Sequence, residues 1–155
     1  MPRRSLASFV CLLSFWAMLC AAPGAEPGRF EQLPMASGLD LFMWTDVCNV
    51  YVLRDGDAAM LIDVGDGSVL EHLGAIGVRR IEWVLLSHHH REQCQGHPQL
   101  RAWQPQVAAP AKERALFERP ADFRKLKPSL GDAFTVHGAS YVRPPVEPLA
   151  IQRAF

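Results

Sequence analysis

The sequence predicts an α/β domain in which strands and helices alternate, and three observations predict it. A run rich in β-branched and aromatic residues, 47–53, and a second apolar run, 58–63, flank the turn residues 54–57. Apolar residues with helical spacing follow over 68–76, and another apolar run, 81–86, comes directly before a polar loop. The order strand, strand, helix, strand is typical of folds that contain a βαβ unit.

Residues 1–25 have the layout of a secretory signal peptide. Arg3 and Arg4 precede an almost uninterrupted apolar run over 6–22, and small residues and a proline follow. A basic start, a short apolar core and a small-residue exit are typical of a cleaved signal. A transmembrane anchor is the alternative, but it needs about 20 apolar residues, and this run is shorter. We therefore expect a secreted or periplasmic protein, cleaved near Ala25, with no stable membrane span afterwards.

The charge balance argues against a nucleic-acid partner. The chain has 16 Lys+Arg and 16 Asp+Glu residues, so removing Arg3 and Arg4 with the signal leaves a slight acidic excess. No basic run stands out, whereas nucleic-acid binders usually carry one. Cys48 and Cys94 could pair in an oxidising compartment. One lies in a strand-like run and the other in a polar loop, and we favour two free thiols over a disulfide.

After a lead-in over 26–46, the first expected elements form a β-hairpin. The turn Arg54-Asp55-Gly56-Asp57 joins the two apolar runs, and Asp-Gly between such runs is a strong hairpin signal. The tight loop 64–67 follows, with two glycines that allow unusual backbone angles.

A helix is expected to begin at Ser68, because Ser68 and Glu71 have the spacing of a capping box. Gly77 is expected to end it. The helix would bury the apolar stripe Val69, Leu70, Leu73 and Ile76. Residues 81–86 would then form a buried strand that ends at Ser87, completing the βαβ unit.

The loop after this strand, Ser87 to Gly96, contains three successive histidines, His88-His89-His90. In an extended backbone, residues i and i+2 point to the same side, so His88 and His90 can converge on one ion while His89 points away. Imidazole is a preferred zinc ligand, and a catalytic zinc commonly keeps three protein ligands. The third ligand must then come from elsewhere. The alternative is a solvated loop without metal, and we expect His72 and His97 to be surface residues.

These motifs together resemble those of the metallo-β-lactamase superfamily. That family typically shows an Asn-x-Tyr strand, a strand ending in Ile-Asp-x-Gly, a helix, and an apolar strand running into His-x-His-x-Asp-His. This chain has Asn49-Val50-Tyr51, Ile62-Asp63-Val64-Gly65, the helix, and then His88-His89-His90-Arg91-Glu92-Gln93 with Gly96. The resemblance covers about 47–96 well and 107–117 more loosely, and it implies an αββα sandwich.

The resemblance also implies roles for individual residues. His88 and His90 would supply two ligands of the first metal site, with Asp63 and Gly65 in a supporting loop. Glu92 stands where the family has an aspartate, and it would bind metal, orient the attacking water or act as a base. Gln93 replaces the next histidine, and a neutral amide is a poor zinc ligand. We therefore expect one zinc ion at most, with His137 as a minor candidate for a further ligand.

The resemblance further implies that residues 47–119 correspond to the first half of the domain. Residues 120–155 read as a proline-containing extension, which we expect to be truncated. Val50, Leu61, Ile62, Val84 and Leu86 would then form an inner sheet face without its partner sheet, and the chain alone would not be a competent hydrolase.

Two classes of function remain open. One is a zinc-dependent hydrolase of an unidentified small ester, thioester, amide or phosphoester. The other is a non-catalytic relative, or a truncated gene product, that acts as a binding module.

Overall fold

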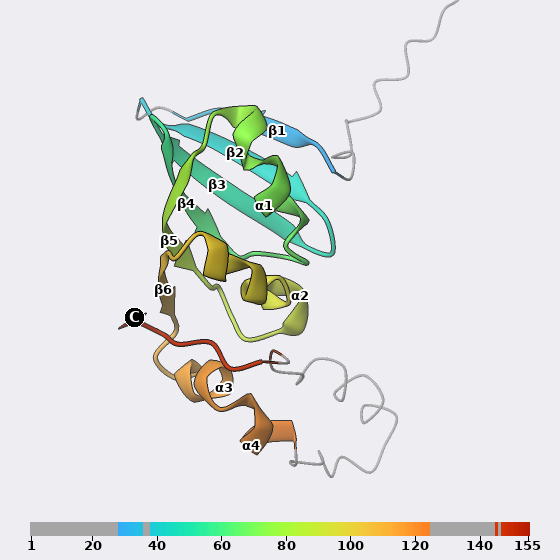
Figure 1. Cartoon of the computed structure of the whole chain (residues 1–155), viewed down its shortest axis with the longest axis vertical. Coiled ribbons are helices and arrows are strands. Elements are labelled where there is room, and N and C mark those ends of the chain that lie inside the picture. Colours follow the sequence, from blue (N-terminus) through green and yellow to red (C-terminus); the bar gives the residue numbers. More distant parts are fainter. Residues whose placement is uncertain (1–27, 36–37, 125–144, 146) are drawn as a thin grey trace, which may run out of the picture.

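A computed structural model describes residues 28–35, 38–124, 145 and 147–155, which form one seven-stranded sheet with short helices (Figure 1). The strands lie side by side in the order in which they occur along the chain. They are β1 (Phe30–Leu33), β2 (Asp40–Thr45), β3 (Asn49–Asp55), β4 (Ala58–Ile62), β5 (Arg80–Leu85), β6 (Gln106–Ala109) and β7 (Arg153–Ala154). The pairs from β1 to β4 are antiparallel, and those from β4 to β7 are parallel. The predicted α/β class is confirmed.

The helices are short and lie in the crossovers between the parallel strands. They are α1 (Ser68–His72), the 3-10 helix η1 (Leu73–Ile76), α2 (Arg91–Cys94), the 3-10 helix η2 (His97–Ala102), α3 (Arg114–Glu118) and α4 (Pro120–Arg124). Helices α1 and α2 both lie on the near side of the sheet in Figure 1. None of the helices in the described part of the chain is long and apolar enough to cross a bilayer.

The expected hairpin is present between β3 and β4. Tyr51 pairs with Ile62 and Asp55 pairs with Ala58 across it, and Gly56 in the turn has φ 60°. The first strand begins at Asn49 instead of Val47, because Asp46 and Cys48 form a turn: the Cys48 N–H donates to Asp46 Oδ1 at 3.0 Å.

The helix begins at Ser68 as expected, but the capping box is wrong. Gly67 is the N-cap residue, with φ 95°, and no side chain caps it. The Ser68 N–H instead donates to Asp66 Oδ1 at 2.8 Å, and the Ser68 hydroxyl accepts from the Trp44 indole at 3.2 Å. Contacts with β2 therefore override the local capping pattern. Gly77 ends the second, 3-10 part of the helix in the left-handed conformation, as expected.

Strand β5 returns parallel to β4, and so the βαβ unit is confirmed. The register between the two strands shifts at Ala59/Met60. This irregularity places Glu82 between two paired positions and leaves Trp83 opposite Met60.

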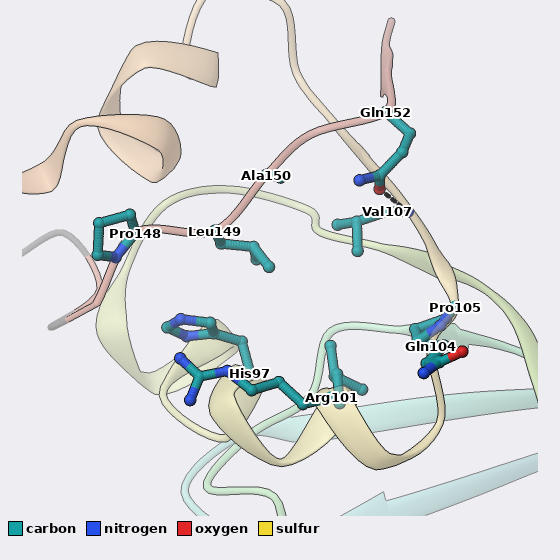
Figure 2. A pocket seen from close by; sticks show the side chains of 10 residues that line it. His97, Arg101, Gln104, Pro105, Val107, Pro148, Leu149, Ala150 and Gln152 are labelled. Carbon is teal, nitrogen blue, oxygen red and sulfur yellow. Dashed lines mark hydrogen bonds between the residues drawn. The ribbon is translucent and has the colours of Figure 1, made fainter.

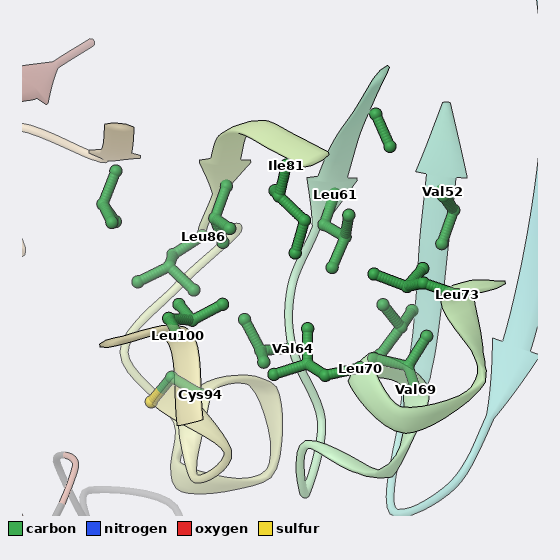
Figure 3. Packing of buried hydrophobic residues seen from close by; sticks show 14 of the residues in the cluster. Val52, Leu61, Val64, Val69, Leu70, Leu73, Ile81, Leu86, Cys94 and Leu100 are labelled. Carbon is green, nitrogen blue, oxygen red and sulfur yellow. The ribbon is translucent and has the colours of Figure 1, made fainter. Parts of the chain in front are cut away.

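The hydrophobic core lies on one face of the sheet, beneath the helices (Figure 3). Alternate residues of each strand point to this face. Its sheet side is formed by Phe42, Trp44, Val50, Val52, Ala59, Leu61, Val84, Leu86, Val107 and Ala109, and the helices contribute Val69, Leu70, Leu73, Cys94, Leu100 and Phe117.

The expectation that Val50, Leu61, Val84 and Leu86 lack a covering layer is therefore wrong. All four have 0% exposure, because the helices of the crossovers cover them. Ile62 is the exception: it is half-buried on the opposite face. Leu61 and Ile62 are neighbours in one strand and so point to opposite faces.

The sheet extends beyond residues 47–119 at both ends. Strands β1 and β2 lie in the expected lead-in, and β7 lies in the expected extension. Ile151 joins the core with 3% exposure, and the Gln152 N–H donates to the Val107 carbonyl at 3.0 Å. The expected signal peptide lies outside the described residues.

Candidate functional site

The candidate site is assembled where the parallel strands β4 and β5 end. The chain continues from β4 into Asp63 and from β5 into Ser87 and the histidine triplet. The Asp63 N–H donates to the Leu85 carbonyl at 2.9 Å, which holds the two strand ends together. Loops at the carboxyl ends of parallel strands are the usual place for reacting groups in α/β folds.

Asp63 and His88 are connected through the Ser87 hydroxyl. Asp63 Oδ1 accepts the Ser87 N–H at 2.8 Å, and Asp63 Oδ2 accepts the Ser87 hydroxyl at 2.7 Å. The same hydroxyl lies 2.9 Å from His88 Nδ1. A hydroxyl has one proton, and since Ser87 gives it to Asp63, its oxygen accepts from a protonated Nδ1. His88 Nε2 then keeps its lone pair, which is the form that binds metal.

Asp63 has an unusual environment for a carboxylate. It is only 7% exposed, and its φ of 63° lies in the left-handed region. Burial raises its pKa above the usual value, while the two hydrogen bonds from Ser87 act in the opposite direction. The strained backbone and the buried acceptor indicate a residue that is held in place by its partners.

The rings of His88 and His90 lie edge to face, with centroids 4.5 Å apart. His90 is half-buried, and burial, followed by the neighbouring His88 and His89, lowers its pKa. A lowered pKa favours the neutral imidazole that a metal ion requires. Glu92 Oε1 lies 4.0 Å from His90 Nδ1, at the start of α2.

His89 contacts both Glu113 and His90, so it does not simply point away from the other two rings as expected. Its backbone N–H donates to Glu113 Oε2 at 2.7 Å, and its Nδ1 lies 3.1 Å from the same oxygen. Its ring centroid also lies 5.0 Å from that of His90. Glu113, just before α3, thus contacts both the backbone and the ring of the middle histidine.

Two glycine-containing loops pack directly against each other beside the histidines. The Gly96 N–H donates to the Gly65 carbonyl at 2.9 Å, and a Cβ atom on Gly96 would lie 2.3 Å from the backbone nitrogen of Gly67. A Cβ on Gly65 would lie 2.2 Å from Asp46 Oδ2. Glycine is therefore required here for close approach, and this contact fixes the position of α2 relative to the end of β4.

Asp46 also organises the loop around Gly65. Its carboxylate accepts from the Cys48 and Asp66 N–H groups at 3.0 and 3.3 Å. Burial raises its pKa, and the nearby Asp66 adds to this. In contrast, hydrogen bonds from Ser68 lower the pKa of Asp66. Asp46, Ser87 and Glu113 were not predicted from the sequence as residues of the site. For Asp46 the local sequence signal was its turn with Cys48, and for Ser87 it was the position at the end of a strand. Glu113 had no local sequence signal.

Cys48 and Cys94 are both free thiols in this structure. Burial raises the pKa of each to about 12. The Cys94 thiol is fully buried and donates to the His90 carbonyl at 3.2 Å, so it supports the triplet from within the core.

The described residues do not complete a metal site. They contain no group of three or more His, Cys, Asp and Glu side chains arranged to hold an ion. The two imidazoles of His88 and His90 fit two positions of a zinc site in chemistry and proximity. Gln93 Oε1 is buried nearby, without a hydrogen-bond partner in the described part of the protein. His137 lies outside the described residues.

His97 is buried rather than exposed, which corrects the expectation. It is 4% exposed, and its Nδ1 lies 2.9 Å from the Cys94 carbonyl oxygen. It lines a cavity of about 250 Å³ between η2 and residues 148–152, together with Leu100, Val107 and Leu149 (Figure 2). None of the three successive histidines lines this cavity. His72 is exposed, as expected, and stacks against Trp44 with a centroid distance of 4.7 Å.

Comparison with known families agrees with this geometry. The model of the metallo-beta-lactamase superfamily matches residues 43–153 of the chain. The chain therefore belongs to the metallo-β-lactamase superfamily. A search of curated proteins gives no match.

Solved structures of this superfamily share the fold. A metallo-beta-lactamase of Cronobacter sakazakii, described by its HARLDQ motif, is 22% identical with a TM-score of 0.52, covering 74% of this chain and 40% of that one. BJP-1 of Bradyrhizobium japonicum is 18% identical with a TM-score of 0.52, covering 81% and 45%. MEM-A1, from a soil metagenome library, is 17% identical with a TM-score of 0.56, covering 81% and 46%. The chain thus spans less than half the length of these structures.

Proposed function

We propose that this chain provides half of a zinc site in a metal-dependent hydrolase, with His88 and His90 as ligands of one ion. The observation that carries the proposal is the edge-to-face pair of His88 and His90, 4.5 Å apart between centroids, at the end of a superfamily strand. Remaining ligands would come from outside the described residues.

The hydrogen bonds of the loop support this assignment. The Asp63–Ser87–His88 chain orients the His88 ring and leaves Nε2 available, as outer partners of zinc-binding histidines usually do. Burial lowers the pKa of His90, which favours its neutral, metal-binding form. Glu92 is close enough to His90 to orient a water molecule or accept a proton from it.

The sequence His88-His89-His90-Arg91-Glu92-Gln93 can be compared with the HARLDQ motif that names the Cronobacter sakazakii protein. Both have histidine first and glutamine last, with an acidic residue before the glutamine. Glutamine at the last position therefore also occurs in a protein described as a metallo-beta-lactamase. Gln93 is compatible with hydrolase chemistry on this ground, although an amide remains a weak zinc ligand.

Bound zinc would supply an activated water and stabilise developing negative charge on a substrate oxygen. The residues of this chain would orient His88, exclude solvent beneath the triplet and place Glu92 beside the reacting group. The substrate would be a small molecule with an ester, thioester, amide or phosphoester bond, since superfamily membership does not fix the choice. We propose no nucleic-acid partner, because the chain has neither an excess of basic residues nor a basic run.

Zinc titration by isothermal calorimetry tests the proposal. We expect one zinc ion at most per chain, and a loss of binding by at least roughly tenfold for His88→Ala or His90→Ala. His72→Ala is the matched control, because His72 is an exposed histidine on another element. His89→Ala should have a small effect, provided that its melting curve is unchanged. Equal losses in all variants, or no zinc binding by the parent chain, would refute the site.

The alternative function is a non-catalytic binding module of the same fold. It is favoured by the lack of a three-ligand group among the described residues. Zinc analysis of the purified protein separates the two functions, because only the hydrolase requires a bound ion. Without added ligands, we expect the chain to hydrolyse no β-lactam or ester faster than free zinc does.

We also propose that the protein is exported, because residues 1–25 have the composition of a cleaved signal. N-terminal sequencing of the expressed protein should then start near Ala25. An intact Met1 in the cytoplasmic fraction would contradict export.

A further inference from the structure

The main chain of the three successive histidines belongs to no strand or helix. Strand β5 ends at Leu85 and α2 begins at Arg91, so the regular hydrogen bonds of strand and helix do not fix the backbone of residues 88–90. A buried N–H group in such a loop needs an acceptor from elsewhere in the protein. The conformation of the triplet therefore depends on the side chains that supply these acceptors.

Two carboxylates accept alternate N–H groups of this loop. Asp63, after the end of β4, accepts the Ser87 N–H at 2.8 Å. Glu113, which precedes α3, accepts the His89 N–H at 2.7 Å. The second bond holds the peptide group that joins His88 to His89, and this group lies between the two candidate ligands in the chain. Its orientation sets the direction in which both ligand rings leave the backbone.

Glu113 is itself held in place after the end of β6. Its N–H donates to the Pro110 carbonyl at 3.0 Å, and its own carbonyl accepts the Leu116 N–H at 2.8 Å at the start of α3. Strand β6 leads into this turn and pairs with β5, the strand that precedes the histidines (Figure 1). The Glu113 side chain is half-buried. Its carboxylate therefore connects the end of β6 to the loop that follows β5.

Glu113 also lies near the ring of His89, but this contact is of a different kind. Glu113 Oε2 is 3.1 Å from His89 Nδ1, yet neither ring nitrogen of His89 has a hydrogen-bond partner among the described residues. The carboxylate is thus aligned with the backbone N–H and not with the ring. Since every residue except proline has a backbone N–H, this bond does not require histidine at position 89.

We propose that Glu113 is a positioning residue of the candidate zinc site and acts through the backbone of His89. It fixes the peptide group between the ligands, and so it keeps the rings of His88 and His90 edge to face, with centroids 4.5 Å apart. Outer partners that orient the ligands are usual in zinc sites. The effect on zinc binding rests on the proposed function, whereas the positioning of the two rings does not.

Zinc competition titrations of the full chain and its variants test the proposal. We expect Glu113→Ala to weaken zinc binding by roughly tenfold or more, as the loss of an outer partner does. Glu113→Met, which has a similar length and no oxygen, should do the same. Glu113→Gln keeps an oxygen that can accept the N–H, and its affinity should stay within roughly threefold of the parent. His89→Ala removes the ring, keeps the N–H and should have a small effect.

Glu118→Ala is the matched control, because Glu118 is an acidic residue of α3 that pairs with Arg114 at 2.8 Å. Its zinc affinity should equal that of the parent. Circular dichroism should show the same content of strand and helix in all variants. The visible absorption of bound Co²⁺ reports the arrangement of the ligands around the ion. This spectrum should change in Glu113→Ala and stay unchanged in Glu113→Gln and Glu118→Ala.

NMR of the metal-free chain separates this proposal from the zinc site. Nuclear Overhauser contacts between the rings of His88 and His90 should be present in the parent and in Glu113→Gln, and weak or absent in Glu113→Ala and Glu113→Met. A parent that binds no zinc would refute the zinc site, and the ring contacts would then still decide the role of Glu113. Ring contacts that persist in Glu113→Ala, an unchanged zinc affinity in that variant, or an equal loss in Glu113→Gln would overturn the proposal.

Discussion

Ser87 is the residue on which the geometry of the histidine loop depends most directly. Its backbone and hydroxyl both donate to Asp63, and its oxygen lies 2.9 Å from His88 Nδ1. A single side chain therefore satisfies a buried carboxylate and sets the tautomer of a candidate ligand. The Ser87 residue is exposed, so substitutions there leave the packing of the core unchanged.

We expect Ser87→Ala to weaken zinc binding by about 10- to 100-fold, because the second partner of the ligand is lost. Stability should fall by about 1 kcal/mol, as Asp63 loses one hydrogen bond. Ser87→Thr keeps the hydroxyl and is the control. Zinc competition titrations and thermal melts measure the two effects, and equal zinc affinity in Ser87→Ala would rule out the orienting role.

His97 gives the stability of the chain a pH dependence. Burial lowers its pKa below that of a free histidine, about 6.5. The folded state therefore binds the proton less readily than the unfolded state. The stability that neutral His97 contributes is fully present above the pKa of the unfolded state. It is lost as the pH falls from that value towards the lower pKa of the folded state.

We expect His97→Asn to reduce the loss of stability between pH 7 and pH 5.5 relative to the parent, since the amide can still donate to the Cys94 carbonyl. Its stability at pH 7 should be lower because the ring no longer fills its place. His72→Asn, at an exposed position, should keep the parent slope. Urea unfolding across this pH range provides the measurement, and an unchanged slope in His97→Asn would contradict the assignment.

At the scale of elements, the contact between the 64–67 loop and the start of η2 holds the site together. Gly96 touches the backbone of Gly67, and the Val64 N–H donates to the Gln93 carbonyl at 2.8 Å. These contacts attach the C-terminal end of the histidine loop to the end of β4, and the hydrogen bonds from Ser87 to Asp63 attach its N-terminal end. Displacement of either loop would separate His88 from the groups that orient it.

We expect Gly96→Ala to destabilise the chain by about 2 kcal/mol or more, because its Cβ would collide with backbone atoms that have no space to move into. Gly74→Ala is the matched control: a Cβ there meets nothing within 4 Å, and the change should stabilise by about 0.5 kcal/mol. Chemical denaturation of both variants measures the difference. Equal stabilities would show that the loop contact is dispensable.

Local patterns at this scale predicted the elements well and their ends less well. The Asp-Gly turn and the apolar runs were sufficient for the hairpin, since both features act within a few residues. The capping pattern at Ser68 failed because Trp44 and Asp46, more than 20 positions earlier, bind the serine and its neighbours. Strand β1 was missed because it is short and has two polar residues in its middle, and β2 was missed because its four central residues are all apolar and show no alternation.

For the whole molecule, the sequence predicted the fold class and the βαβ unit, but not which face of the sheet would be covered. Val50 and Leu61 were expected on the same face as Ile62, although Leu61 and Ile62 are neighbours in one strand and therefore point to opposite faces. Of the site, the neighbouring positions of His88 and His90 follow from alternation. The partners Ser87 and Glu113 depend on distant chain segments that no spacing rule connects.

The strand order has a consequence for how the chain folds. Each strand pairs only with strands that precede or follow it directly, so the sheet grows by addition at one edge. A chain emerging from a ribosome or translocated from its N-terminus can therefore complete β1 to β4 before β5 is available. The last pairing, of β7 with β6, joins strands that are far apart in the sequence, as Ala108 pairs with Arg153. Local pairings generally form faster than distant ones, so we expect β7 to be the last strand to join the sheet.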